Sequence, residues 1–268
     1  MSSQYENLPK PDDYAAFFKV SPAEAPTERL VRANRISGMV RAMAQPAPSA
    51  AEAKADVAAA ADATDAAATA ATAVPAEAAP ATKPKAPPVQ REWVPAQFGF
   101  VASWVKSASD AKLRAPKQVV ARNETVSTVQ AYRDAWLAGQ RCIIPMQAFF
   151  EDDLRSGKPV PTRISRVDGE PMGVAGVWSS WIDPVSGQEL ISYAILTVNA
   201  NSHALMHRYQ HQGSEKRMPA ILNEGSYDAW LTARQEKARE FLRAYPANWL
   251  TANPVERKQD KKPKGWLG

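Results

Sequence analysis

Cysteine is almost absent from this chain of 268 residues, which has one, at Cys142. A lone cysteine cannot form an intramolecular disulfide, so the chain is unlike the small secreted domains that depend on disulfides. It also has no run of 18 apolar residues, and no charged region followed by a short apolar one near residue 1. These absences argue against a membrane-spanning helix and a secretory signal. We therefore expect a cytoplasmic protein without a membrane partner.

Several common binding and catalytic motifs are missing as well. The sequence has no Gly-rich phosphate loop, no pair of CxxC motifs and no GxSxG segment. These motifs mark, respectively, nucleotide-binding proteins, zinc ribbons and a large class of hydrolases. Their absence removes the usual reasons to expect a nucleotide, and we expect no cofactor.

The three histidines are spaced as i, i+4 and i+8, at His203, His207 and His211. On one helix they would share a face and could hold Zn²⁺ with an open coordination position. The alternative is a polar helix face that runs into a loop. Gln212 and Gly213 favour this alternative, because a helix would fail near His211. The segment also lacks the carboxylates that usually orient histidine ligands, so we expect no metal site.

A long segment from about Gln45 to Val89 has little that could enter a hydrophobic core. It is nearly all Ala, Pro, Thr, Glu, Asp and Lys, with no aromatic residue. Such a composition buries too little apolar surface to offset the entropy of ordering, so we interpret residues 45–89 as a disordered insertion. It would interrupt one domain formed by residues 1–44 and 90–252. Residues 253–268 form a basic tail, and the net charge of +5 permits nucleic-acid binding.

Strand-like segments outnumber helical ones. Short apolar or β-branched runs predict strands, or strand and turn, at residues 92–106, 119–120, 141–144, 162–166, 173–179 and 192–198. Helices are expected at residues 12–20, at 127–137 with Gly139 as the C-cap, and at 202–210 and 226–244. Because the strands follow one another at hairpin spacing, we expect an α+β fold with a mainly antiparallel sheet.

The stretch RCIIPMQAFFED, residues 141–152, is the most informative for chemistry. Its apolar start is typical of a buried strand, and Pro145 predicts the end of that strand because proline has no N–H to donate. Glu151 would then lie just beyond the strand end, beside two phenylalanines. A partly desolvated carboxyl group there could serve as a general acid or base. The alternative is an ordinary ion pair with an arginine.

Two further segments bring a cation next to a strand. In ARNETV, residues 121–126, Arg122 could bind a phosphate group in a bidentate manner and Thr125 could add a hydroxyl contact. The alternative is a loop that caps the following helix, with Arg122 in a structural ion pair. In KRMPAIL, residues 216–222, Arg217 stands beside an apolar strand or turn, which by itself indicates little.

Taken in order, six segments resemble the SOS-response-associated peptidase (SRAP) family, whose members process abasic sites in single-stranded DNA. FGFVASW is similar to the family's WGLIPxW, ARNETV to NARxET and RCIIPMQAFFED to RCLVPADGFYEW. AGVWSSW is similar to AGLWExW, YAILTVNAN to TILTxxAN and EKRMPAIL to HxRMPVIL. The resemblance extends from Trp93 to about Leu250, and on these motifs the chain is identified as a divergent member.

The resemblance implies a compact domain with a barrel-like sheet and flanking helices, and a reaction with DNA. In the family, the α-amine of a cysteine exposed by removal of the first Met attacks the aldehyde of an abasic sugar. The thiol then closes a thiazolidine. By resemblance, Glu151 assists opening of the sugar ring and proton transfer. Arginine and aromatic side chains hold the DNA strand, and the corresponding candidates are Trp104, Arg122, Asn123, Thr125 and Arg217.

The chain departs from the family pattern at its first residues, where Met1-Ser2-Ser3-Gln4 replaces Met-Cys-Gly-Arg. The family Asn aligns with Val120 and the family His with Glu215, so His211 is a candidate for that histidine's role. If Met1 is removed, the α-amine of Ser2 can still form an imine. The Ser2 hydroxyl would close an oxazolidine, which hydrolyses more readily than a thiazolidine. We therefore expect a transient Schiff base, which β-elimination can follow, in place of a durable crosslink.

Two alternatives remain open, and with them whether the protein is an enzyme. The loss of family residues at the site also fits a DNA-binding module without chemistry. A self-processing peptidase would use Ser2 as a nucleophile beside Glu151, although no Ser, His, Asp arrangement is evident from spacing. The expected partners are single-stranded and abasic-site DNA, bound by a monomer.

Overall fold

The computed structural model describes residues 4–24, 26–43, 89–211 and 213–255. Ser2, nearly all of the expected insertion and most of the basic tail lie outside these residues. The chain divides into two units, residues 1–42 with 91–268 and residues 43–90, and the helices and strands of the described residues belong to the first. In the part that the structure describes, no helix is long and apolar enough to cross a membrane.

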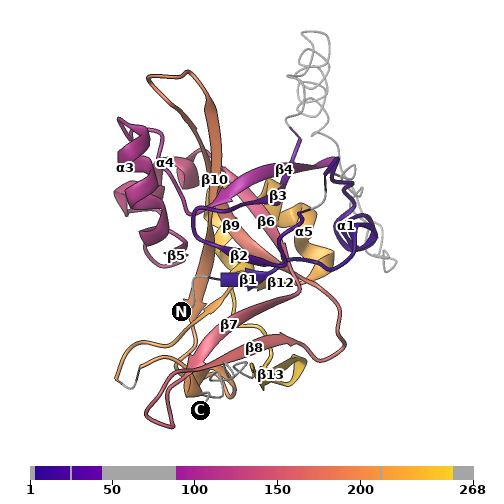
Figure 1. Ribbon diagram of the computed structural model, residues 1–268. Helices are drawn as coiled ribbons and strands as arrows, with labels where there is room; N and C mark the ends of the chain where they lie inside the picture. The colour runs from indigo at the N-terminus through magenta and orange to yellow at the C-terminus, as the bar shows by residue number, and fades with distance from the viewer. Residues whose placement is uncertain (1–3, 25, 44–88, 212, 256–268) are drawn as a thin grey trace, which may run out of the picture. The chain divides into compact units, whose positions relative to one another are not determined.

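Five strands close into a barrel (Figure 1). They are β3 (Ile36–Ala42), β4 (Arg91–Phe98), β6 (Arg141–Met146), β9 (Met172–Ile182) and β10 (Glu189–Asn199). The order is β10-β4-β3-β6-β9, and β9 pairs again with β10, which closes the ring. The β10–β4 contact is parallel and the other contacts of the ring are antiparallel. The expected α+β fold with a mainly antiparallel, barrel-like sheet is confirmed.

Short strands extend this barrel, and a second sheet holds five more. The extensions are β5 (Val120–Arg122) and β11 (Arg217–Pro219) on β10, and β12 (Ile221–Leu222) on β9. The second sheet has the order β13-β8-β7-β1-β2, with β13 (Leu250–Pro254), β8 (Val160–Arg166), β7 (Ala148–Asp153), β1 (Gln4–Glu6) and β2 (Leu30–Arg32). It brings the first described residues of the chain against the strand that carries Glu151.

Helices are short. They are α1 (Pro11–Phe18), α3 (Ala108–Arg114), α4 (Gln130–Leu137), α5 (Tyr227–Thr232) and α6 (Gln235–Ala238). Single 3-10 turns are η1 (Ala115–Lys117), η2 (Met206–Arg208), η3 (Glu224–Ser226), η4 (Arg239–Phe241) and η5 (Ala247–Trp249). The predicted end of α4 at Leu137 is confirmed, but the C-cap is Ala138 and not Gly139, which follows with a left-handed φ of 73°.

The helix expected at residues 226–244 is wrong as one element. Ala233 leaves the helical region with a ψ of 136°, so α5 ends at Thr232 and α6 starts only at Gln235. The Thr232 hydroxyl donates to the Asp228 carbonyl, a bond of the kind that competes with the helical backbone ladder and bends helices.

The prediction that Pro145 ends its strand is also wrong, since β6 continues to Met146. Pro145 pairs with Gly173, two residues along from the pair of Ile143 with Ala175. Ala175 donates its N–H to Ala220 and not to β6. Opposed residues in an antiparallel pair alternate between hydrogen-bonded and non-hydrogen-bonded positions, so Pro145 shares the position that needs no bond to β9.

Two tryptophans connect helices α4 and α5 to the barrel. Trp136 and Trp230 are buried, their ring centroids lie 6.4 Å apart, and the Trp230 indole N–H donates to the Cys142 carbonyl at 2.9 Å. The guanidinium of Arg141 lies over both rings, at 5.3 and 5.8 Å from their centroids. The helices therefore cover strand β6 through aromatic and cation–π contacts, which stabilise most when water is excluded.

Gly176 marks a place where the barrel has no room for a side chain. It lies in β9, opposite Cys142, and a Cβ atom there would meet Ile144 Cδ1 at 2.3 Å and Cys142 Sγ at 2.8 Å. We expect Gly176→Ala to lower the free energy of unfolding by about 1–3 kcal/mol because the packed strands cannot move apart freely. Urea unfolding measures this. The control is Gly225→Ala, whose Cβ would meet nothing within 4 Å, and equal losses in the two variants would contradict the packing argument.

Candidate functional site

Glu151 lies inside strand β7 and is 2% exposed. The expectation that it follows a strand end is wrong, because β8 pairs with β7 beyond this position, with Glu151 opposite Thr162. Its neighbours Phe149 and Phe150 are buried as well. The sequence therefore identified a carboxyl group that is enclosed, but placed it outside a strand instead of within one.

The pairing of β1 with β7 brings the beginning of the chain toward Glu151. Tyr5 pairs with Phe149 and Glu6 with Ala148 in antiparallel register. In such a register, moving from Glu6 to Gln4 along β1 corresponds to moving from Ala148 toward Glu151 along β7. The start of β1 is thus directed to the end of β7 that carries the carboxyl group.

Buried polar contacts hold β1 in this register. The Tyr5 and Tyr193 hydroxyls are hydrogen-bonded to each other, and burial raises the pKa of both, so both keep their protons. The Glu6 carboxylate accepts from Arg29 and from Arg163, each at 2.6 Å. Asn7 continues the set by accepting from Ser37. β1 is therefore tied both to the barrel and to the second sheet.

Arg217 is the centre of a second polar cluster. It is 6% exposed, and its guanidinium donates to both carboxylate oxygens of Glu124, at 3.0 and 2.9 Å, and to Glu215 at 2.7 Å. It also donates to the Thr197 carbonyl on β10 at 2.6 Å. Burial alone would lower the pKa of Arg217, but the bonds to Glu124 and Glu215 raise it. The positively charged Arg217 side chain thus connects the segment around Glu124 to strand β10.

Arg122 joins the same cluster through Glu215, at 2.8 Å, while remaining 58% exposed. The structural ion pair considered for Arg122 is therefore present, and its exposed face still reaches solvent. Asn123 donates its backbone N–H to Thr197, and the exposed Thr125 accepts at its carbonyl from the turn that precedes α4. Arg122 and Arg217 come from strands on opposite edges of β10, and the structure joins them through Glu215, with Asn123 and Thr125 in the turn after Arg122.

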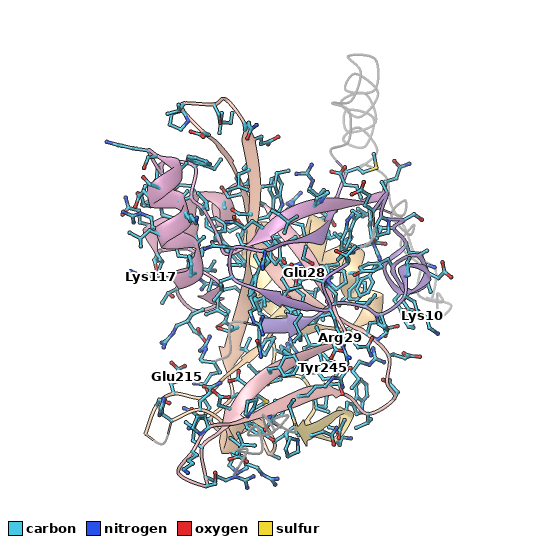
Figure 2. The ribbon with its side chains drawn as sticks, in the orientation of Figure 1. Lys10, Glu28, Arg29, Lys117, Glu215 and Tyr245 are labelled. Atoms are coloured by element: carbon cyan, nitrogen blue, oxygen red, sulfur yellow. The ribbon has the colours of Figure 1, made fainter. Side chains whose placement is uncertain are left out.

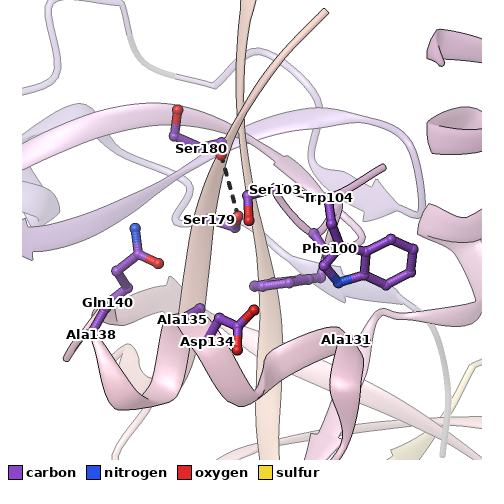
Figure 3. A pocket seen from close by; sticks show the side chains of 11 residues that line it. Phe100, Ser103, Trp104, Ala131, Asp134, Ala135, Ala138, Gln140, Ser179 and Ser180 are labelled. Atoms are coloured by element: carbon purple, nitrogen blue, oxygen red, sulfur yellow. Dashed lines mark hydrogen bonds between the residues drawn. The ribbon is translucent and has the colours of Figure 1, made fainter. Parts of the chain in front are cut away.

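Trp104 lies in a different part of the fold. It is 36% exposed and lines a hollow of about 270 Å³ together with Phe100, Asp134 and Gln140 (Figure 3). The guanidinium of Arg114 lies 5.3 Å from its ring centroid. Among the predicted DNA-binding residues, Trp104 is thus placed with helices α3 and α4 and not with the Arg217 cluster.

The helix expected at residues 202–210 is wrong, because only the turn η2 forms. The His203 imidazole explains this: Nδ1 accepts from the backbone of Met206 at 3.0 Å, and Nε2 donates to the Tyr245 carbonyl at 2.7 Å. This buried ring caps a turn where a helix was expected. His211 has an exposed side chain in the following loop. The described residues contain no group of His, Cys, Asp or Glu suited to a metal ion.

Comparison with known proteins decides the family. A family model described as SOS response associated peptidase (SRAP) matches residues 38–261, well over half of the chain. The chain belongs to the SRAP family. A solved protein from Bordetella bronchiseptica has a TM-score of 0.73 and 29% identity, covering 96% of this chain and 100% of its own.

Named relatives match a smaller share of this SRAP chain. It is 26% identical over 186 residues to the Gallus gallus protein named Abasic site processing protein HMCES, covering 62% of this chain and 53% of that protein. It is 29% identical over 163 residues to Abasic site processing protein YoqW of Bacillus subtilis, covering 59% and 67%. The chain thus spans about half the length of the HMCES relative it matches.

Sequence reasoning missed the residues that position β1 in this SRAP domain. Glu6 and Arg163 meet although 157 residues separate them, and Tyr5 and Tyr193 are 188 apart. No local motif signals such pairs. A charged residue inside an otherwise strand-like run, as at Glu6 and Arg163, was the available hint.

The ion pairs of Glu215 predict a pH dependence of stability. Its pKa is lowered from the usual 4.5, first by the hydrogen bond from Arg217 and then by that from Asn199. A carboxyl group whose pKa is lowered by folding stabilises the fold at pH values above its usual pKa. This contribution is lost as the pH falls through the lowered pKa. We expect Glu215→Gln to lose less unfolding free energy than the parent chain between neutral pH and pH values below 4.5. Urea titrations at both pH values test this. Glu24→Gln, at an exposed position, should behave like the parent chain, and parent-like behaviour of Glu215→Gln would refute the idea.

Proposed function

We propose that this SRAP protein binds single-stranded DNA and reacts with the aldehyde of an abasic site through its N-terminal amine. One observation carries the proposal: the β1–β7 register directs the beginning of the chain toward the buried Glu151. The relatives named as abasic site processing proteins supply the substrate class. Ser2 itself lies outside the described residues, so its part rests on the sequence.

The chemistry requires removal of Met1. The α-amine of Ser2 would then have a pKa of about 7.7 to 8.0, which leaves a useful fraction neutral at physiological pH. Its nitrogen attacks the aldehyde carbon, the carbonyl oxygen takes up a proton, and loss of water leaves a protonated Schiff base. Removal of a proton from the neighbouring sugar carbon then expels the 3′ phosphate as its C–O bond breaks. This sequence is β-elimination and cuts the strand.

Glu151 is proposed as the proton carrier for these steps. A buried carboxyl group such as that of Glu151 can donate a proton to the departing oxygen and accept one afterwards. His211, exposed in the loop after η2, is the candidate for the family histidine. Neither role involves a metal or another cofactor.

The DNA strand is proposed to follow the exposed faces of Arg122 and Thr125. Arg122 keeps over half of its side chain in solvent, so it can contact a phosphate in addition to Glu215. Arg217 is already bonded to two carboxylates, so we assign it the positioning of Glu124 and Glu215, with Asn123 in the same turn. Trp104 is proposed to contact a base further along the strand.

Borohydride trapping tests the covalent step, because hydride adds to the C=N bond and fixes the adduct. The parent chain is expected to give a trapped adduct with abasic single-stranded DNA. Glu151→Gln should slow its formation by about 10²-fold, the usual lower contribution of a general acid or base. The control is Asp152→Asn, which changes an exposed neighbour on the same strand. Equal trapping rates for Glu151→Gln and Asp152→Asn would exclude the proposed role of Glu151.

Ser2→Cys is expected to convert a transient adduct into a durable one. A thiol closes a thiazolidine, whereas the Ser2 hydroxyl closes the less stable oxazolidine. Denaturing gels without borohydride should show a DNA adduct for Ser2→Cys and none for the parent chain. Mass spectrometry of the intact chain first establishes that Met1 is absent. An adduct of the parent chain that survives denaturation without reduction would overturn the transient Schiff base.

A DNA-binding module without chemistry is the second candidate. The residues at three family positions favour it, because Ser2, Val120 and Glu215 stand where the family has Cys, Asn and His. The two functions are distinguished by trapping: a module would bind abasic DNA, yet give no adduct with borohydride. The proposed setting in either case is a monomer in the cytoplasm.

A further inference from the structure

A pocket next to the Glu151 strand is lined by cations and is distinct from the Arg217 cluster. Its volume is about 630 Å³. It is formed by the chain that follows β7 and by the loop between η2 and β11, with the lining residues Leu154, Arg155, His207, Arg208, Gln210, Gly213 and Lys216. Among the described residues, this lining contains two arginines, a lysine and a histidine, and no acidic residue. Its chemistry is therefore that of an anion site.

The charges of this cationic pocket are only partly balanced. Arg155 pairs with Asp153 at 2.6 Å. Arg208 forms no ion pair with a described carboxylate. Its charge still acts on Asp153, whose pKa is lowered mainly by the hydrogen bond from Arg155 and in part by Arg208. The Lys216 ammonium donates to the carbonyls of Gln210 and His211, at 3.1 and 2.5 Å, which orients it without neutralising it. A positive charge held by neutral carbonyls in a concave site retains its attraction for a phosphate group.

Gln210 connects this pocket both to the Arg217 cluster and to strand β7, which carries Glu151. Its side-chain amide donates to the Arg217 carbonyl at 2.8 Å and accepts from the Arg217 N–H at 3.1 Å. Its own N–H donates to the Asp152 carbonyl, one residue after Glu151. Gln210 also has a left-handed φ of 66°, which turns the loop back over the strand. The pocket is therefore held against the Glu151 strand and against the Arg217 cluster.

We infer that this cationic pocket binds a backbone phosphate of the DNA strand whose abasic sugar lies at Glu151. Leu154 follows Glu151 by three residues, which on an extended chain is about 10 Å. That separation suits a phosphate near the reacting nucleotide on the same strand. The inference rests on the proposed function, since it assigns Arg208 and Lys216 to the same substrate. A free nucleotide offers the same phosphate chemistry and is the competing source.

The salt dependence of DNA binding tests the inference. For single strands, log K falls with log salt by about 0.7 for each phosphate contact. Fluorescence anisotropy with abasic-analogue single-stranded DNA should give a slope about 0.7 shallower for the double variant Arg208→Gln, Lys216→Gln, because the pocket holds one phosphate, and a smaller change in the same direction for Arg208→Gln. The single variant is the safer one, because Lys216 also orders the loop while Arg208 has no described ion pair.

The matched control is Lys10→Gln, which removes one exposed charge at the start of α1. Figure 2 places Lys10 on the opposite side of the view from Glu215, the neighbour of Lys216. Its salt slope should equal that of the parent chain. Displacement of the DNA by a mononucleotide at concentrations where the parent chain binds DNA would instead favour the free nucleotide and overturn the inference.

The outcomes separate the two ideas. If the parent chain binds and is trapped on abasic DNA, yet Arg208→Gln has the same salt slope as Lys10→Gln, the cationic pocket is not a phosphate site and the proposed function stands. If the parent chain gives neither DNA binding nor a trapped adduct, the proposed function fails and the pocket inference fails with it. A shallower slope confined to the pocket variants supports both.

Discussion

Strand β10 is the constraint on which the rest of the molecule depends, because its two edges are divided among four partners. One edge pairs with β4 near Tyr193 and then with β5, while the other pairs with β9 and then with β11. The switch from barrel to extension occurs within this single strand. A strand can form hydrogen bonds on only two edges. β5 and β11 can therefore pair with β10 only beyond the residues at which β4 and β9 stop pairing with it. Those short strands carry Arg122 and Arg217.

The same strand also supplies side chains and carbonyls to the site. Tyr193 bonds to Tyr5 and thereby fixes β1, whereas Thr197 accepts from Arg217. The beginning of the chain and the Arg217 cluster are thus positioned by one rigid element. Its pairing energy is distributed over a long ladder, which makes the geometry insensitive to the loss of any single exposed ion pair. Rigid placement of this kind is what a reaction between an amine and an aldehyde requires.

Charge is arranged differently in the two clusters around Glu151. Arg217 is buried and fully engaged by carboxylates, and such an arrangement orders the backbone more than it attracts a ligand. In the cationic pocket, by contrast, backbone carbonyls hold Lys216, and the exposed Arg208 forms no ion pair with a described carboxylate. Family membership predicts an arginine at the RMP motif, whereas the pocket is formed by the loop that precedes this motif and by the chain that follows β7. Under the proposed function, the Arg217 cluster shapes the site, and the cationic pocket is available to a strand of DNA.

The sequence by itself determined the family, the α+β class and the enclosure of the Glu151 carboxyl group, because ordered motifs and alternating apolar residues are local signals. It could not determine that Pro145 continues a strand, since this depends on which side of β6 pairs with β9. It misjudged residues 202–210 as helix, because the His203 ring finds its partner, the Tyr245 carbonyl, 42 residues away. The ion pair of Glu6 with Arg163 likewise depends on the tertiary structure alone. The same holds for the cationic pocket. Contacts between distant segments leave no periodic trace in either segment, so burial and charge pairing emerge only when the barrel closes.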